Sequence, residues 1–273
     1  VAHGLASGDA LVVGSQVERL VALYRRDPER RSGWRVEFEF EFEGVPRAIA
    51  ESDVDGDGDL ELTVAGGDAE HWTFGAGESG GASAWLDDEP LRPLRTSFGS
   101  VPNALLRDGA GALWALSLVE QSLVRLGRPS GTALARRFGT YAGQRPVDIA
   151  AADFDGDGTI DVAVANREAR RVSLLCGDSD ATPRVGRRVG VGRAPSNVTC
   201  ADLDGDGASE IVALAALAER WCVVSTIAGE TRVVADGAAG REAIDLALAD
   251  LAGDGALDLA LLRAPEAGSA LLA

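Results

Sequence analysis

An acidic turn with regularly spaced carboxylates recurs along this chain. It reads DVDGDGDLE at 53–61, DFDGDGTID at 153–161 and DLDGDGASE at 202–210, and a fourth copy, DLAGDGALD at 250–258, has lost one acid. The three intact copies have acids at positions 1, 3, 5 and 9 and glycines at positions 4 and 6. Ca²⁺ takes six to eight oxygen ligands at about 2.3–2.6 Å, which alternate carboxylates and a main-chain carbonyl at position 7 can supply. The spacing therefore predicts a cation site in each turn.

Two other interpretations of this turn are a hairpin without an ion and the loop of an EF-hand. Four uncompensated carboxylates within a few ångströms repel one another strongly, which favours an ion. An EF-hand requires Glu at position 12, where the chain has Val64, Val164 or Ala213 within predicted strands. We therefore predict strong Ca²⁺ binding by the intact turns and weaker binding by the fourth, where Ala252 replaces an acid. The predicted metal-binding residues are Asp53, Asp55, Asp57, Asp59, Glu61, Asp153, Asp155, Asp157, Thr159, Asp161, Asp202, Asp204, Asp206, Ala208, Glu210, Asp250, Asp254, Ala256 and Asp258.

The distances between the turns indicate a repeat of about 49 residues. The turns are 100, 49 and 48 residues apart, so the first gap should contain a further unit. RDGAGALWALS at 107–117 fills that gap, but Ala110 and Trp114 align with positions 5 and 9, so no ion is expected there. GLASGDALVV near the N-terminus is interpreted as a sixth, degenerate copy.

Each repeat contains short apolar segments that predict strands. The fourth unit shows four of them, VDIAAA (147–152), IDVAVA (160–165), RVSLLC (171–176) and RVGRRVGV (184–191). Four strands per repeat of about 49 residues are typical of a propeller blade, whereas the alternative, a β-solenoid, usually has shorter coils. We therefore predict an all-β fold, a β-propeller of four-stranded blades.

The ends of the chain are expected to carry incomplete blades. The first unit should lack its first strand because the chain begins at the turn, and the last should end after its third strand. The termini would then pair to close a ring, or further blades or another chain would complete it, because an open blade leaves an exposed edge. The six units of this single predicted domain are 1–44, 45–100, 101–144, 145–193, 194–241 and 242–273.

The composition limits the classes of partner. The formal net charge of −17 argues against nucleic acid and anionic membrane surfaces. No apolar run reaches the roughly 18–20 residues of a membrane span, so membrane insertion is not expected. The three cysteines, Cys176, Cys200 and Cys222, are too widely spaced for a zinc or redox motif, and free thiols are expected.

The acidic turns, the repeat length and the Phe98-Gly99 and Phe138-Gly139 pairs resemble FG-GAP/VCBS repeats, the units of the integrin α-subunit β-propeller. This resemblance implies that the acidic turn joins the innermost strand to the second and holds Ca²⁺ on one face. It also implies that a ligand binds the opposite face, formed by the loops after the second and fourth strands. A tryptophan there suits a sugar ring and arginines suit acidic groups, unless they only pack between blades or face solvent. The predicted ligand-binding residues are His71, Trp72, Tyr141, Arg145, Asn166, Arg167 and Arg193.

These observations lead us to expect a calcium-stabilised binding module for a protein or a glycan. We expect it to be extracellular or on the cell surface, with a signal peptide that is not part of this sequence. Alternatives are a lyase-like enzyme acting on polysaccharide and a structural spacer in a larger secreted protein. An enzyme is not expected, because His3 and His71 are the only histidines and no Ser/His/Asp or Cys/His arrangement can be assembled.

Overall fold

The computed structural model describes residues 2–7, 10–41, 44–52, 61–66, 70–74, 94–97, 101–108, 113–126, 137–177, 184–191, 194–227 and 229–264. The chain divides into two compact units, Val1–Gly139 and Thr140–Ala273. In the described segments the regular structure is β-strand, apart from one 3-10 turn, η2 (Ala216–Ala218). None of these segments forms a helix with the length and apolar character needed to cross a membrane.

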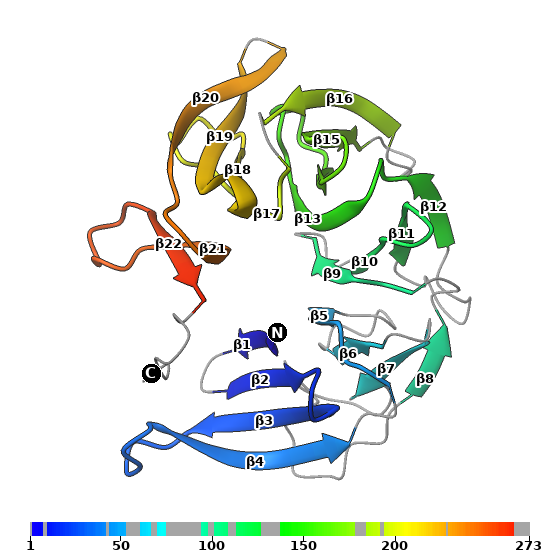
Figure 1. The fold of residues 1–273 in the computed structure, drawn as a ribbon, viewed down its shortest axis with the longest axis vertical. Helices are drawn as coiled ribbons and strands as arrows, with labels where there is room; N and C mark the ends of the chain where they lie inside the picture. The colour runs from blue at the N-terminus through cyan, green and yellow to red at the C-terminus, as the bar shows by residue number, and fades with distance from the viewer. Residues whose placement is uncertain are drawn as a thin grey trace. The chain divides into compact units, whose positions relative to one another are not determined.

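The first unit contains three four-stranded sheets whose strands follow chain order (Figure 1). Neighbouring strands with an assigned register pair antiparallel. Sheet 1 consists of β1 (Ala2–Ser7), β2 (Ala10–Ser15), β3 (Leu20–Arg26) and β4 (Trp34–Glu41). Sheet 2 consists of β5 (Ala48–Ser52), β6 (Glu61–Ala65), β7 (Glu70–Phe74) and β8 (Leu94–Ser97). Sheet 3 consists of β9 (Ala104–Arg107), β10 (Leu113–Ser117), β11 (Ser122–Leu126) and β12 (Arg137–Tyr141), which crosses the boundary between the units.

The second unit continues the same pattern with antiparallel pairing throughout its described strands. Sheet 4 consists of β13 (Pro146–Ala152), β14 (Asp161–Asn166), β15 (Arg171–Cys176) and β16 (Arg184–Gly190). Sheet 5 consists of β17 (Asn197–Ala201), β18 (Glu210–Ala215), β19 (Arg220–Ile227) and β20 (Glu230–Ala238). Sheet 6 has two described strands, β21 (Ala243–Ala249) and β22 (Asp258–Arg263).

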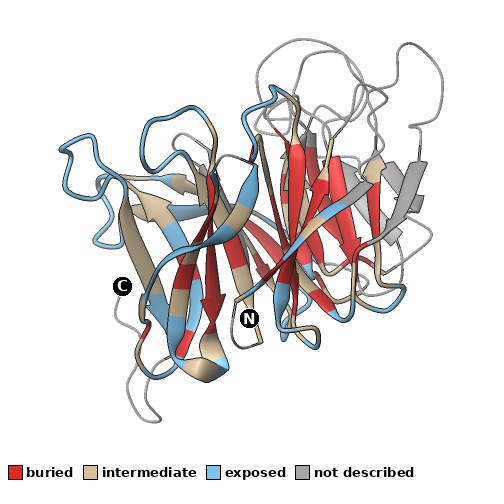
Figure 2. Ribbon diagram, turned by 90° about the horizontal axis from the view of Figure 1, so that it is seen from above, coloured by how far each residue is buried: buried red, intermediate tan, exposed pale blue. Residues whose placement is uncertain are grey.

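Small and β-branched residues allow the sheets within each unit to pack face to face. Every residue of β14 (DVAVAN) and β18 (EIVALA) is buried, because these second strands are covered on both faces. Ala163, Val172 and Leu174 of sheet 4 share a core with Ile211 and Val224 of sheet 5. Figure 2 shows the buried residues along the strands and many of the exposed ones in the turns that connect them.

The four strands predicted in the fourth unit are confirmed as β13 to β16, each within a residue or two of its predicted ends. The prediction that the first repeat (1–44) lacks its first strand is wrong. The six residues of β1 pair with β2 from Ala2 opposite Ser15 to Ser7 opposite Ala10. Gly4, taken as part of the turn, lies within this strand. The described residues thus form five four-stranded sheets rather than four, and the predicted third strand of the last unit lies outside them.

Candidate functional site

The first described acidic loop, loop 4 (residues 153–161), connects β13 to β14. Its first carboxylate organises the backbone. Asp153 Oδ1 accepts the amides of Asp155 (3.3 Å), Gly156 (2.7 Å) and Asp157 (3.2 Å), and Oδ2 accepts that of Gly158 (2.8 Å). Gly156 and Gly158 have φ values of +76° and +83°, a conformation that residues with a Cβ adopt at a cost. The glycines therefore let the chain wrap around this carboxylate.

The last acid of loop 4 is buried beneath the others. Asp161 is 2% exposed, and its carboxylate accepts the amides of Phe154 (3.2 Å) and Gly177 (2.8 Å). Burial raises the pKa of Asp161 to about 6; the two amides oppose this shift, and the charges of Asp155 and Asp157 add to it. A buried carboxylate beside other carboxylates is the arrangement that a bound cation would stabilise.

The position-5 acid is held differently. Asp157 Oδ1 accepts the hydroxyl of Thr159 (2.6 Å) and the amide of the same residue (2.7 Å). These hydrogen bonds lower the pKa of Asp157 from its usual value. Asp157 is therefore ionised at neutral pH, as a metal ligand must be.

Loop 5 (residues 202–210) repeats this construction between β17 and β18. Asp202 accepts the amides of Gly205 (2.7 Å) and Gly207 (3.0 Å). Glu210 is 4% exposed and accepts the amide of Leu203 (2.9 Å), as Asp161 does that of Phe154. The remaining predicted residue of this loop, Ala208, donates its amide to Asp206 (2.8 Å).

Within each of loops 4 and 5, the carboxylates lie close enough together to bind one ion. In loop 4, Asp153, Asp155 and Asp157 each offer one oxygen within 4.8 Å of the others, and in loop 5 Asp202, Asp204 and Asp206 do the same. Ligands on opposite sides of a Ca²⁺ ion are about 4.6–5.2 Å apart. Both clusters therefore fit a metal ion, with hard oxygen donors at the required separation.

Loop 6 (residues 250–258) keeps the backbone arrangement without the position-3 acid. Asp250 accepts the amides of Gly253 (2.6 Å), Asp254 (3.1 Å) and Gly255 (2.8 Å), which lower its pKa. The last acid, Asp258, accepts the amide of Ala252 (3.2 Å), and Ala256 donates its amide to Asp254 (3.0 Å).

Loops 4 and 5 are in direct contact. The amide of Ser209 donates to the carbonyl of Asp153 (2.8 Å), which joins the end of loop 5 to the start of loop 4. Phe154, the second residue of loop 4, is 1% exposed and packs in the core shared by sheets 4 and 5. A change in the conformation of one loop will therefore alter the conformation of the other.

Most of the predicted metal-binding residues of the intact turn at 53–61 fall on a part of the chain that the structure does not describe. Asp53, Asp55, Asp57 and Asp59 lie outside the described residues, as does the side chain of Glu61 at the start of β6.

In sheet 3, the degenerate copy of the acidic turn does not have its residues at the positions that the sequence alignment gave them. The connection from β9 to β10 covers residues 108–112, three fewer than 153–160 in sheet 4, so Leu113 at the start of β10 takes the place of Asp161 and Trp114 lies one residue beyond it. The buried carboxylate of Asp108 accepts the indole Nε1–H of Trp114 (2.9 Å) and pairs with Arg125 (3.4 Å). An arginine therefore balances the charge of this acid.

Cys176 was not predicted as part of the site. Its Sγ lies within 4.8 Å of carboxylate oxygens of Asp155 and Asp161, because β15 ends beside loop 4. Burial raises the pKa of the thiol, and the neighbouring carboxylates raise it further. All three cysteines are free thiols, as expected. The strand order could have indicated this proximity, since the last residue of a third strand lies beside the first residue of the second.

The predicted ligand-binding residues of sheet 4 lie at the end of the sheet opposite loop 4, which we call the turn end. Asn166 is the last residue of β14, Arg167 follows it, and Arg145 precedes β13. The amide of Arg167 donates to the carbonyl of Arg145 (3.1 Å), and Arg145 pairs with Glu168 (3.7 Å). His71 and Trp72 lie in β7 and Tyr141 ends β12, with side chains outside the described set, as is all of Arg193.

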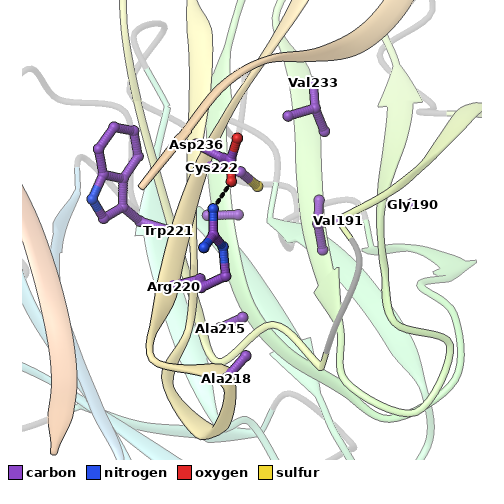
Figure 3. A pocket seen from close by; sticks show the side chains of 10 residues that line it. Gly190, Val191, Ala215, Ala218, Arg220, Trp221, Cys222, Val233 and Asp236 are labelled. Atoms are coloured by element: carbon purple, nitrogen blue, oxygen red, sulfur yellow. Dashed lines mark hydrogen bonds and ion pairs between the residues drawn. The ribbon is translucent and has the colours of Figure 1, made fainter. Parts of the chain in front are cut away.

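Two cavities open at the turn ends of sheets 4 and 5. The basic pocket, of about 250 Å³, is lined by Gly143, Gln144, Asn166, Ala169, Arg171, Ser173 and Arg188. The apolar pocket, of about 390 Å³, is lined by Gly190, Val191, Ala213, Ala215, Ala218, Arg220, Trp221, Cys222, Val233 and Asp236. Figure 3 shows Arg220 directed at Asp236 in the second pocket, with Val191 and Val233 facing them.

The comparisons with known proteins agree with this geometry. The sequence segment from the first acid of loop 4 into β18 matches the model of the FG-GAP-like repeat. Residues 153–213 are an FG-GAP-like repeat. The resemblance drawn from the acidic turns is confirmed for this segment, which contains both loop 4 and loop 5. No curated protein sequence matches the chain.

Solved β-propellers share the fold. A protein of unknown function from Desulfotomaculum acetoxidans DSM 771 is 15% identical with a TM-score of 0.60, over 85% of this chain and 68% of that chain. A chain of the Chaetomium thermophilum Polycomb Repressive Complex 2, in a humanized mutant bound to the inhibitor GSK126, is 11% identical with a TM-score of 0.64, over 96% of this chain and 64% of that chain. The predicted β-propeller fold is therefore confirmed.

Proposed function

We propose that this protein is a calcium-stabilised binding module that recognises a protein or glycan ligand at the turn ends of its sheets. The observation that supports it best is the division of chemistry between the two ends of sheet 4. One end carries Asp153, Asp155 and Asp157 within 4.8 Å of one another, and the other opens into a pocket lined by Arg171 and Arg188.

The metal in this proposal is Ca²⁺, and its role is structural. The donors in loops 4 and 5 are carboxylates and backbone oxygens of a tight loop, which are the hard ligands that Ca²⁺ prefers. A bound ion would neutralise the repulsion among these acids and hold the contact between Ser209 and Asp153, which joins neighbouring sheets. The Ca²⁺ end would thus stabilise the scaffold, and the turn end would remain free for a ligand.

We propose a binding role rather than catalysis, at an extracellular or cell-surface location where Ca²⁺ is abundant. The turn ends of sheets 4 and 5 offer two concave sites of different character, one polar and basic and one apolar. Pockets with a few convergent polar groups are typical of ligand sites.

The test is a screen of the chain against a glycan array and a panel of secreted proteins, in Ca²⁺ and in EDTA. The proposal predicts binding to a defined ligand that weakens in EDTA as the scaffold loosens. The variant Asp155→Ala should weaken binding partly, because it removes a carboxylate from loop 4 and leaves those of loop 5 in place. Absence of any ligand in Ca²⁺ would contradict the proposal, and turnover of an acidic polysaccharide would show a lyase-like enzyme instead.

A further inference from the structure

The backbones of loops 4 and 5 approach each other at two points. The amide of Ser209 in loop 5 donates to the carbonyl of Asp153 in loop 4 (2.8 Å). A methyl group at Gly156 of loop 4 would lie 3.9 Å from the Cβ of Ala208 in loop 5. The two loops therefore lie side by side.

The hydrogen bond from Ser209 belongs to a path that connects predicted ligands of the two loops. Ser209 follows Ala208, so the peptide group that carries the predicted position-7 carbonyl of loop 5 also carries the amide that donates to Asp153. The carbonyl of Asp153 shares its peptide group with the amide of Phe154, and that amide donates to Oδ2 of Asp161 (3.2 Å). Asp161 is the last acid of loop 4. Two peptide groups therefore join a predicted ligand of loop 5 to a predicted ligand of loop 4.

This path can transmit the effect of an ion from one loop to the other. Linked hydrogen bonds polarise one another, so a carbonyl drawn toward a cation makes the amide of its own peptide group a better donor. Phe154 is 1% exposed and lies in the same core as Ile211 and Val224 of sheet 5, which fixes the middle of the path. Ordering of loop 5 around an ion should therefore hold Asp153 and Asp161 in place in loop 4.

Loop 6 is not joined to loop 5 in this way. Leu257 stands where loop 5 has Ser209, and no backbone hydrogen bond among the described residues joins its amide to loop 5. Leu203, the loop 5 residue equivalent to Phe154, is 38% exposed. Loops 5 and 6 therefore lie on neighbouring sheets without the path, which gives a control within the chain.

We propose that loops 4 and 5 bind Ca²⁺ with positive cooperativity, whereas loop 6 binds independently of them. This inference rests on the proposed Ca²⁺ role of the loops and adds a form of regulation to it. The coupled pair would fill over a narrower range of Ca²⁺ concentration than two separate sites. The scaffold that carries the turn-end pockets would then become ordered in one step.

Direct repulsion between the two cations would act in the opposite direction. An ion in loop 5 adds positive charge near loop 4 and would weaken binding there. Salt screens interactions between exposed charges within about 8 Å at physiological ionic strength, and buried groups are screened much less. The sign of the coupling therefore distinguishes the hydrogen-bond path from an effect through space.

The test is titration of the full, metal-free chain with Ca²⁺ in about 0.15 M KCl, followed by NMR. The amides of Gly156, Gly205 and Gly253 donate to the first acids of loops 4, 5 and 6, so each reports on one loop. The variant Asp206→Asn removes a charge from loop 5 and keeps an oxygen that can accept the position-7 amide. Asp254→Asn makes the same change at the same position of loop 6, and it is the matched control.

We expect the signals of loops 4 and 5 to titrate together in the wild type, with a Hill coefficient above one. In Asp206→Asn the affinity of loop 4 should fall at least about fivefold, the lower end of typical coupling between sites, while the affinity of loop 6 stays unchanged. Asp254→Asn should leave loops 4 and 5 as in the wild type. Because coupling is reciprocal, Asp157→Asn in loop 4 should weaken loop 5 in turn. Well-dispersed spectra in Ca²⁺ show that each variant is folded.

An unchanged or tighter affinity of loop 4 in Asp206→Asn would overturn the cooperativity, as would an unaffected loop 5 in Asp157→Asn. If Asp254→Asn weakened loop 4 as much as Asp206→Asn does, the coupling would spread through the whole scaffold and the assigned path would be wrong. In each of these outcomes Ca²⁺ still binds, so the proposed function stands. A wild type whose glycine amides do not respond to Ca²⁺ would instead remove the proposed role of the ion itself.

Discussion

Removing Asp155 tests whether the acidic loops hold ions or only shape a turn. Its carboxylate belongs to the loop 4 cluster, but the backbone amides of the loop bond to Asp153 and Asp157 instead. Asp155→Ala should therefore leave the metal-free loop folded, and it should relieve some repulsion. In Ca²⁺ the variant loses a charged ligand and should bind the ion at least tenfold more weakly.

The magnitude follows from ligand linkage. A site at a hundredfold excess over its Kd adds about 2.7 kcal/mol to stability, and at a tenfold excess about 1.4 kcal/mol. A tenfold loss of affinity thus costs about 1.3 kcal/mol, or a fall in melting temperature of roughly 3–5 °C for a chain of this size. This fall should appear in Ca²⁺ and disappear in EDTA.

The reverse change supplies the control from the chain itself. Ala252→Asp restores the position-3 acid of loop 6, whose other acids Asp250 and Asp254 are already placed by backbone amides. It should raise stability in Ca²⁺ and lower it in EDTA, where a further like charge is uncompensated. Differential scanning calorimetry of both variants in the two buffers is the assay. If both variants shift equally with and without Ca²⁺, the loops are acidic turns and our reasoning about the ion is refuted.

Two further predictions concern acids outside the loops. Burial raises the pKa of Asp148 to about 7, and the charge of Asp245 adds to the shift, so the folded state holds this proton more tightly than the unfolded state and stability should fall as pH rises from about 4 to 7. Asp148→Asn, the residue that the next repeat has at Asn197, should flatten this slope in saturating Ca²⁺ and add roughly 1–2 kcal/mol to the free energy of unfolding at pH 7.5. An unchanged slope in urea unfolding across pH would count against this prediction. Asp108→Ala should destabilise the chain by about 3 kcal/mol equally in Ca²⁺ and EDTA, because it leaves Trp114 Nε1 and the guanidinium of Arg125 without their carboxylate; a loss seen only in Ca²⁺ would show that this acid binds metal.

The sequence was sufficient for the features that depend on local spacing. The alternation of acids and glycines in 153–161 places carboxylates on one side of a tight loop, and the structure holds them there through Asp153. The apolar segments of the fourth unit became strands because each is bounded by turn residues and is long enough to cross a sheet. The all-β repeat architecture followed from these two patterns.

The N-terminal strand was missed because its signal is weak. AHGLAS contains a glycine and small residues, and only its pairing with β2 identifies it as a strand. Turn signals in a degenerate repeat do not reveal whether an edge strand precedes them. The shortened connection in sheet 3 was misaligned for a related reason, since a connection three residues shorter places Leu113 and not Trp114 at the first position of the second strand.

The chemistry of the turn end could be found only with the strand register. Asn166 and Arg167 were identified from their place after the second strand, but Arg171, Ser173 and Arg188 were not. These residues meet because β14, β15 and β16 pair in a particular register, which brings Ser173 opposite Arg188. The same register shows that Arg188 and Asp236 occupy equivalent positions. The sequence spacing alone does not show this, because each sheet contains a bulge between its third and fourth strands.

The most direct test of the account is the melting temperature of the wild-type chain in excess Ca²⁺ and in EDTA. Three strong sites, each at a hundredfold excess over its Kd, would add about 8 kcal/mol to the free energy of unfolding. For a chain of this length that predicts a melting temperature at least about 15 °C higher in Ca²⁺. An identical melting temperature in the two buffers would contradict the claim that the acidic loops bind Ca²⁺ and hold the propeller together.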